Sequence, residues 1–304
     1  MKILFLQRII NYKMLWFLSF LLFLFVLNMF FHIIAMNVCK QCNAKFNDNI
    51  QNFSVLTFNI HGSDQDWYLS QRVDSLFALI KNNDADFVLL NEYYASCSNK
   101  LDTLIRSHYR FSSSIGRHDI SYGEMIYSKY PIENVEAISD SSYDNYSYHA
   151  VINKANEKIS VYCCHLRSNN YDENNNRFEF SEIKSLSNLY KHFPIYNYSS
   201  KKRGEMTDKI LSYVSKDKNK YIIIAGDMND FCFSSSIRKL IRAGFSDSWW
   251  EGGNGYGGTF KNGFFAFRID YIFYNNYLSL SDIKLVNTGK LSDHNALKAT
   301  FCLR

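Results

Sequence analysis

Residues 221–230, YIIIAGDMND, indicate the fold class more clearly than any other stretch of the sequence. The apolar run that opens this stretch is typical of a β-strand covered on both faces. The run leads straight to Asp227, so a carboxylate stands where the strand ends. Asp227 and Asn229 are two positions apart, and side chains at that spacing share a face where the backbone stays extended. The stretch therefore predicts a buried strand that presents polar groups at one edge of a sheet.

The same pattern of an apolar run beside a polar residue recurs along the chain. It places Asn59 in VLTFNIHG, Glu92 in FVLLNE, His165 in ISVYCCHL, Asp270 in RIDYIFY, and Asp293 and His294 in LSDHNALKATF. Each motif alone has an ordinary structural explanation, since Asn and Asp residues commonly make turns. Their common position beside strand ends favours one convergent site.

Helical and strand patterns alternate in the sequence. YLSQRVDSLFALIKNND, residues 68–84, has apolar residues at helical spacing and lies between the strand runs FSVLTFNI and ADFVLLNE, which predicts a layered α/β fold. Further strand candidates are GEMIYSKYPI, AVINKANEKISVYCCHL, FRIDYIFY and ALKATFCL. After His165, an Asn-rich loop precedes two helical patterns, FEFSEIKSLSNLYKHF and KKRGEMTDKILSYVSKDKN. This long segment is either a substrate lid or a solvated helical insertion.

EGGNGYGG, residues 251–258, contains the spacing of a dinucleotide-binding glycine motif. Such a motif must follow a strand and open a helix. This run follows SDSWW and leads into another strand candidate. We therefore interpret it as a loop without a cofactor role.

The N-terminal region contains a long apolar segment, residues 15–36, without Asp, Glu, Lys or Arg. About 20 apolar residues span a bilayer, whereas the apolar core of a signal peptide usually has about 7–15. We favour a signal anchor over a long cleaved signal peptide. The expected organisation is a cytoplasmic stub and transmembrane anchor at 1–40, a linker at 41–52 and a catalytic domain at 53–304. Lys2, Arg8 and Lys13 precede the span, which predicts a single-pass membrane protein whose catalytic domain lies outside the cytoplasm.

The formal net charge of +5 arises largely from the N-terminus, which carries four basic and no acidic residues in 1–40. The remainder has 34 − 4 = 30 basic groups against 29 acidic groups. A protein that follows a nucleic-acid backbone usually has a marked basic excess. Long DNA is therefore a disfavoured substrate.

The seven cysteines are an odd number and do not suggest a disulfide framework. Cys39 and Cys42 lack two further zinc ligands nearby, so a local disulfide or two free thiols is expected. Cys163 and Cys164 lie within an apolar strand. Because neighbouring strand residues point to opposite faces, Cys164 is not expected to form a nucleophilic pair with His165.

Several of the polar residues suit metal and acid–base chemistry. Glu92 offers a carboxylate at a strand end, which is a preferred Mg²⁺ ligand. Asp293 and His294 add a second carboxylate and an imidazole, and an Asp–His pair is a common acid–base device near neutral pH.

The motifs TFNIHG, NE, IYSKYPI, HL, GDMND, RIDYIF and SDH resemble, in this order, those of the endonuclease/exonuclease/phosphatase superfamily. The resemblance covers about residues 53 to 303 and implies a four-layer α/β/β/α sandwich of two mixed sheets with a divalent-metal site. It implies metal binding by Glu92, Asn59 and Asp293, and catalytic roles for His165, Asp227, Asn229, Asp270 and His294. It also suggests that Asn59, Arg268 and Arg203 contact the substrate phosphate. The family often has a glutamine three residues after the Arg203 position, where Met206 stands here.

The resemblance implies hydrolysis of a phosphoester by an activated water, with Mg²⁺ or Mn²⁺ as cofactor. The first motif, NIHG, disfavours an abasic-site endonuclease. The substrate class stays open between a lipid headgroup, a small molecule and nucleic acid. An extracytoplasmic nuclease is the main alternative, and a vestigial binding module or an anchored structural domain are the non-catalytic ones. The membrane is an expected partner through the N-terminal helix, and no obligate protein partner is inferred.

Overall fold

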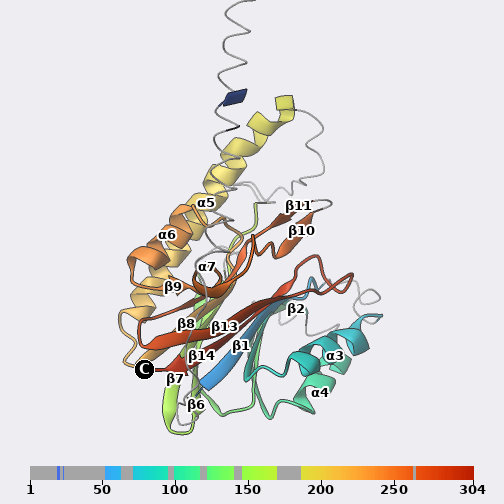
Figure 1. Ribbon diagram of the computed structural model, residues 1–304, viewed down its shortest axis with the longest axis vertical. Coiled ribbons are helices and arrows are strands. Elements are labelled where there is room, and N and C mark those ends of the chain that lie inside the picture. Colours follow the sequence, from blue (N-terminus) through green and yellow to red (C-terminus); the bar gives the residue numbers. More distant parts are fainter. Residues whose placement is uncertain are drawn as a thin grey trace, which may run out of the picture.

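The computed structural model describes residues 52–62, 71–94, 99–116, 122–139, 146–169, 186–262 and 265–304, together with positions 19, 20 and 23. Within these residues, two six-stranded sheets are stacked face to face, with helices on both outer sides (Figure 1). Both sheets are mixed, because each contains one parallel strand pair. This part of the chain therefore has the expected α/β/β/α layers.

The first sheet has the strand order β13-β14-β1-β2-β4-β3. Its strands are β1 (Asn52–Asn59), β2 (Phe87–Tyr94), β3 (Phe111–Gly116), β4 (Tyr122–Ser128), β13 (Leu278–Val286) and β14 (Ala296–Leu303). The helices α3 (Val73–Asn83) and α4 (Asn99–Arg106) cover its outer face. The predicted helix at 68–84 is thus confirmed over Val73–Asn83.

The second sheet has the strand order β5-β6-β7-β8-β12-β9. Its strands are β5 (Ile132–Ser139), β6 (Tyr146–Lys154), β7 (Glu157–His165), β8 (Tyr221–Asp227), β9 (Ser246–Asp247) and β12 (Asp270–Tyr274). The helices α5 (Leu186–Val214) and α6 (Ser235–Arg242) cover its outer face, and the short helix α7 (Ser248–Gly252) follows β9. A hairpin of β10 (Phe260–Asn262) and β11 (Phe265–Phe267) leads into β12.

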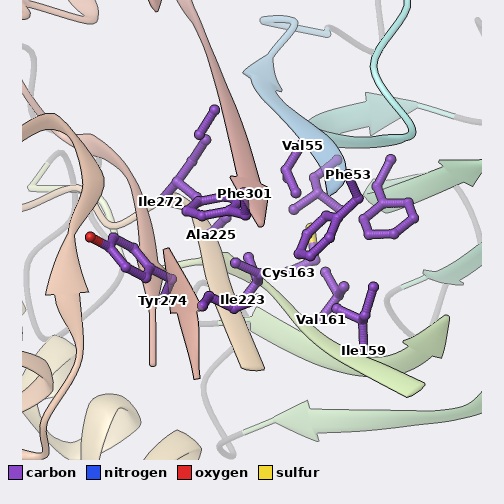
Figure 2. Close-up of a cluster of buried hydrophobic side chains, with 14 of the residues drawn as sticks. Phe53, Val55, Ile159, Val161, Cys163, Ile223, Ala225, Ile272, Tyr274 and Phe301 are labelled. Atoms are coloured by element: carbon purple, nitrogen blue, oxygen red, sulfur yellow. The ribbon is translucent and has the colours of Figure 1, made fainter. Parts of the chain in front are cut away.

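The buried apolar residues alternate between the layers with a period of two. On β8, Ile223 and Ala225 face the core between the sheets, whereas Ile222 and Ile224 face α5 and α6. Figure 2 shows this inter-sheet core, to which Phe53, Cys163 and Phe301 also contribute. The alternation follows from the pleat of a strand, which sends successive side chains to opposite faces. Any polar residue in the inward register at a strand end must therefore lie beside the core.

Two predicted elements differ from the observed ones. AVINKANEKISVYCCHL is two antiparallel strands, β6 and β7, joined at Ala155 and Asn156. Both residues have positive φ angles, 51° and 72°, as a two-residue turn of this kind requires. The two helical patterns after His165, as far as the structure describes them from Leu186 on, form one helix, α5, which contains Pro194. A single proline removes one helical hydrogen bond, and the later part of α5 packs on the second sheet through Met206 and Ile210.

The later part of α5 is thus a layer of the fold and not a lid, while the Asn-rich loop before it lies outside the described residues. The same holds for the CxxC at Cys39 and Cys42, the linker and most of the predicted anchor at 15–36. Among the helices that the structure describes, none is long and apolar enough to cross a bilayer.

The glycine-rich run at 251–258 wraps the buried Trp249. A Cβ atom added to Gly253 or Gly257 would lie 2.4 Å or 2.2 Å from the Trp249 ring, so both positions require glycine. Trp249 Nε1 also donates a hydrogen bond to the Gly255 carbonyl (3.1 Å). The run therefore has a packing role, consistent with our rejection of a dinucleotide site.

Candidate active site

A row of polar side chains lies where three adjacent strands of the second sheet begin or end, next to the inter-sheet core. The strand register places His165 beside Asp227 and Asp227 beside Asp270 on the adjacent strands β7, β8 and β12. Neighbouring strands are about 4.8 Å apart, so these side chains meet although their positions in the sequence are distant. The structure thus brings together three of the predicted catalytic residues.

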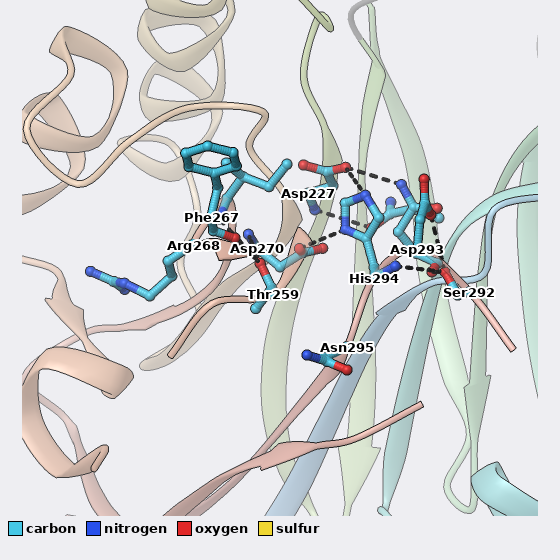
Figure 3. Close-up of polar contacts among 12 residues, drawn as sticks. Asp227, Thr259, Phe267, Arg268, Asp270, Ser292, Asp293, His294 and Asn295 are labelled. Atoms are coloured by element: carbon cyan, nitrogen blue, oxygen red, sulfur yellow. Dashed lines mark hydrogen bonds and ion pairs between the residues drawn. The ribbon is translucent and has the colours of Figure 1, made fainter. Parts of the chain in front are cut away.

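His294, which precedes β14, contacts two members of this row (Figure 3). Its Nδ1 atom lies 2.8 Å from Asp270 Oδ2, and its Nε2 atom lies 3.8 Å from Asp227 Oδ2. Thr259 Oγ1 accepts a hydrogen bond from the backbone N–H of Asp270 (3.1 Å), and Ser292 Oγ accepts one from the backbone N–H of His294 (2.9 Å). Asp270 and His294, two of the predicted catalytic residues, therefore form a pair whose backbone N–H groups are bound by the Thr259 and Ser292 hydroxyls.

Burial and mutual charge shift the pKa values of these groups. Burial raises the pKa of Asp227 to about 6, and the negative charge of Asp270 adds to this effect. Burial opposes the charged form of His294, but the carboxylates of Asp270 and Asp227 outweigh it and raise the pKa to about 10. At neutral pH the imidazole of His294 is a cation, and Asp227 titrates close to that pH.

Asn59 connects Asp227 with Glu92. Its Nδ2 atom donates to Glu92 Oε1 and to Asp227 Oδ2, both at 3.0 Å, and its Oδ1 atom accepts the backbone N–H of His61 (2.9 Å). Both ends of the Asn59 amide are thus used within the protein. Asn59 therefore orients the two carboxylates, and its role as a metal or phosphate ligand stays a prediction.

Asp293 and Glu92 approach the same imidazole, that of His61. His61 Nδ1 lies 3.2 Å from Asp293 Oδ2 and 3.7 Å from Glu92 Oε2. The two carboxylates are partly exposed, with 33% and 23% of their side-chain surface accessible. They are the most accessible acidic groups of the site, whereas Asp227 and Asp270 are buried.

Glu124 on β4 is a site residue that the sequence analysis missed. His165 Nδ1 lies 3.3 Å from Glu124 Oε1, and His165 Nε2 lies 3.7 Å from Glu92 Oε1. Burial opposes the charged imidazole, but the hydrogen bond to Glu124 and the charges of Asp227 and Glu92 raise the pKa of His165 to about 9. The signal for Glu124 was a carboxylate at an inward position of the strand GEMIYSKYPI, beside the buried Ile126.

Asn91, also missed, ties the two sheets together at the site. Its Oδ1 atom accepts the backbone N–H of Asp227, and its Nδ2 atom donates to the Cys164 carbonyl, both at 3.1 Å.

Asn229 does not share an extended face with Asp227, because its φ angle is +48° and the chain turns there. Its backbone N–H donates to Asp227 Oδ1 (2.8 Å), and its Nδ2 atom donates to the Leu166 carbonyl (2.9 Å).

The predicted phosphate contacts of Arg203 and Arg268 are not supported. Arg203 is fully buried and pairs with Asp230, with its Nε atom 3.0 Å from Asp230 Oδ2. Arg268 Nη1 lies 2.6 Å from Asp247 Oδ2, and its side chain points away from His294 (Figure 3). The family resemblance suggested a phosphate contact for Arg268, but Arg268 precedes β12 and its guanidinium pairs with Asp247.

The two cysteines of β7 lie on opposite faces of the second sheet, as expected. Cys163 belongs to the inter-sheet core and Cys164 to the cluster beneath α5 and α6. Burial raises the pKa of the Cys164 thiol to about 12. A neutral thiol turned away from His165 excludes the Cys–His nucleophile.

Residues 56–294 match the Endonuclease/Exonuclease/phosphatase family. The chain belongs to this family. A comparison with curated proteins gives no match.

Solved structures share the fold of this endonuclease/exonuclease/phosphatase chain. An endonuclease/exonuclease/phosphatase from Bacteroides vulgatus has a TM-score of 0.63 and 15% identity, over 84% of this chain and 100% of that one. D. rerio TDP2 complexed with single strand DNA product has a TM-score of 0.62 and 18% identity, over 83% and 99% of the two chains. SmcL has a TM-score of 0.60 and 18% identity, over 83% and 99%. These likenesses establish the fold, and the family match supports a phosphoester hydrolase in general.

The chemistry of the site fits a divalent cation, which proteins of the endonuclease/exonuclease/phosphatase family generally use. Ligand atoms of Asp227, Asp270 and His294 lie within 4.8 Å of one another, and Glu92 is connected to Asp227 through the amide of Asn59. Asp270 Oδ1 is buried and has no hydrogen-bond partner among the described residues. The imidazolium of His294 offsets part of the negative charge of Asp227 and Asp270, and the accessible carboxylates of Glu92 and Asp293 offer the oxygen ligands that Mg²⁺ prefers.

Proposed function

We propose that this chain is a metal-dependent phosphoester hydrolase in which water attacks phosphorus in line with the leaving oxygen. The observation that carries the proposal is a pair of imidazole–carboxylate contacts, His294–Asp270 and His165–Glu124, on either side of Asp227. In each pair Nδ1 faces the supporting carboxylate, and Nε2 faces the centre of the site. This arrangement leaves one ring nitrogen of each histidine directed to the place where a phosphate would bind.

The pKa values separate the roles of the central residues. Asp227, with a pKa of about 6, can accept a proton from the attacking water near neutral pH. His165, with a pKa of about 9, stays protonated and can give its proton to the leaving oxygen. His294 stays cationic and binds a phosphate oxygen, oriented by Asp270. Asn229 fixes the Asp227 carboxylate through its backbone N–H.

Glu92 and Asp293 are the proposed metal ligands, with Mg²⁺ as the cofactor or Mn²⁺ in its place. Metal ligands must be deprotonated, and these two carboxylates are accessible, whereas the nearby imidazole of His294 is protonated at neutral pH. A bound divalent ion would neutralise the charge that develops on the phosphate in the transition state.

The substrate class we propose is a phosphodiester or phosphomonoester of a lipid headgroup or a small molecule. The near balance of 30 basic and 29 acidic groups after residue 40 supports this choice over long nucleic acid. A nuclease is the second candidate, favoured by the shared fold with a TDP2 that holds a single strand DNA product.

We also propose that residues 15–36 anchor the protein in a membrane, with the catalytic domain outside the cytoplasm. Protease treatment of intact cells is expected to remove the catalytic domain from the membrane fraction. Recovery of the intact protein in the soluble fraction would contradict this topology.

Hydrolysis of bis(p-nitrophenyl) phosphate by the purified full chain tests the catalytic proposal. We expect Mg²⁺-dependent turnover that EDTA abolishes and that added Mg²⁺ restores, because the metal compensates the clustered carboxylates. A nitrophenyl phosphomonoester assayed in parallel distinguishes a monoesterase. Absence of turnover on both, with intact folding and bound metal, would favour the vestigial binding module.

A further inference from the structure

His61 lies between the two carboxylates to which we assign the metal. Its Nδ1 atom is 3.2 Å from Asp293 Oδ2 and 3.7 Å from Glu92 Oε2, and 48% of its side-chain surface is exposed. Two ligands of one Mg²⁺ or Mn²⁺ ion lie about 3 Å apart when bonds of about 2.1 Å meet at right angles. The imidazole nitrogen is therefore close to ligand spacing from Asp293 Oδ2 and somewhat beyond it from Glu92 Oε2.

The backbone fixes His61 in this position. Its φ angle is +49°, a left-handed conformation that a non-glycine residue keeps only when its surroundings impose it. The N–H of His61 donates to Asn59 Oδ1 (2.9 Å), and its carbonyl accepts from Arg72 Nη2 (3.1 Å). Arg72 also donates to the Leu291 carbonyl, so one guanidinium holds both His61 and the segment that carries Asp293.

We propose that His61 supplies a nitrogen ligand to the divalent ion held by Glu92 and Asp293, and that the site therefore favours Mn²⁺ over Mg²⁺. This inference rests on the proposed metal site. Imidazole suits transition-metal ions, whereas Mg²⁺ prefers oxygen ligands. Glu92 Oε1 is turned to Asn59, which leaves Oε2 on the side of His61.

The alternative role for His61 is that of a counter-ion, an imidazolium that neutralises the two carboxylates. The two roles predict opposite effects of His61→Ala on metal affinity. Loss of a ligand weakens binding, whereas loss of a competing cation frees the carboxylates and strengthens binding. The sign of the change therefore decides between them.

The test is calorimetric titration of the metal-free full chain, without substrate, with Mn²⁺ alone and with Mg²⁺ alone. We expect His61→Ala to raise the Kd for Mn²⁺ by roughly 10- to 100-fold, with a smaller change for Mg²⁺. Electron paramagnetic resonance of bound Mn²⁺ is expected to show coupling to a nitrogen nucleus that disappears in His61→Ala.

His108→Ala is the matched control, because His108 is a partly exposed histidine whose Nε2 atom lies 2.8 Å from Asp84 Oδ1, away from the site. It should leave both Kd values unchanged. Unchanged or tighter Mn²⁺ binding in His61→Ala would overturn the inference.

Glu92→Ala separates this inference from the proposed function. If Glu92→Ala abolishes Mn²⁺ binding and His61→Ala does not weaken it, the metal site stands and the nitrogen ligand is wrong. If the unmodified chain binds neither Mn²⁺ nor Mg²⁺, the metal-dependent function itself is wrong, and the inference is overturned with it.

Discussion

His294→Ala is expected to lower kcat for bis(p-nitrophenyl) phosphate by about 10²- to 10³-fold, the range typical of a group that stabilises charge in the transition state. The physical reason is the loss of the cation that lies 2.8 Å from Asp270 Oδ2 and 3.8 Å from Asp227 Oδ2. Without it, the two buried carboxylates repel each other and one of them takes up a proton, so Asp227 is less often deprotonated and less available as the base. Steady-state kinetics at saturating Mg²⁺ measures the effect, and circular dichroism checks that the fold is retained.

His149→Ala provides the matched control for this prediction. His149 is also largely buried and lies 3.4 Å from an aspartate, Asp217, but it stacks on Tyr162 in another part of the second sheet. We expect this variant to keep nearly normal kcat. A normal rate in His294→Ala, or equal losses in the two variants, would show that the site roles are assigned wrongly.

Gly226→Ala is expected to destabilise the fold by more than about 4 kcal/mol, or to prevent folding. Gly226 precedes Asp227 on β8, has a φ angle of +139° and lies opposite Cys164 on β7. An added Cβ atom would lie 1.9 Å from the Cys164 carbonyl oxygen and 2.8 Å from its carbonyl carbon. Both neighbours are rigid backbone atoms of a paired strand, so the two strands would have to separate next to the site. Urea unfolding measures the loss.

Gly244→Ala separates steric contact from backbone strain in this comparison. Gly244 also has a positive φ angle, 93°, but an added Cβ atom there meets no atom within 4 Å. Its cost should be limited to conformational strain, about 1–3 kcal/mol. Similar free energies of unfolding for the two variants would mean that the β7–β8 contact tolerates a side chain.

The sequence predicted the layers because strand burial leaves a local pattern. The apolar runs before Asp227 and His165 are covered on both faces, and this local apolar character does not depend on the partner strand. The helix at Val73–Asn83 could be predicted for the same reason, because its apolar residues recur at helical spacing. The boundary between β6 and β7 was missed because Ala155 and Asn156 have no strong turn signature, and only their positive φ angles mark it.

The sequence by itself also determined most residues of the candidate site, since strand ends at one edge must converge, but only the tertiary structure decided how they pair. Glu124 contacts His165, and His61 contacts Asp293, across strands that are far apart in the chain. The family resemblance suggested that Arg203 and Arg268 contact the phosphate, yet each pairs with a buried aspartate. Local sequence records which side chains are charged and which positions are buried. The partner of each charge depends on the register of strands brought together from distant parts of the chain, and packing of the two sheets fixes that register.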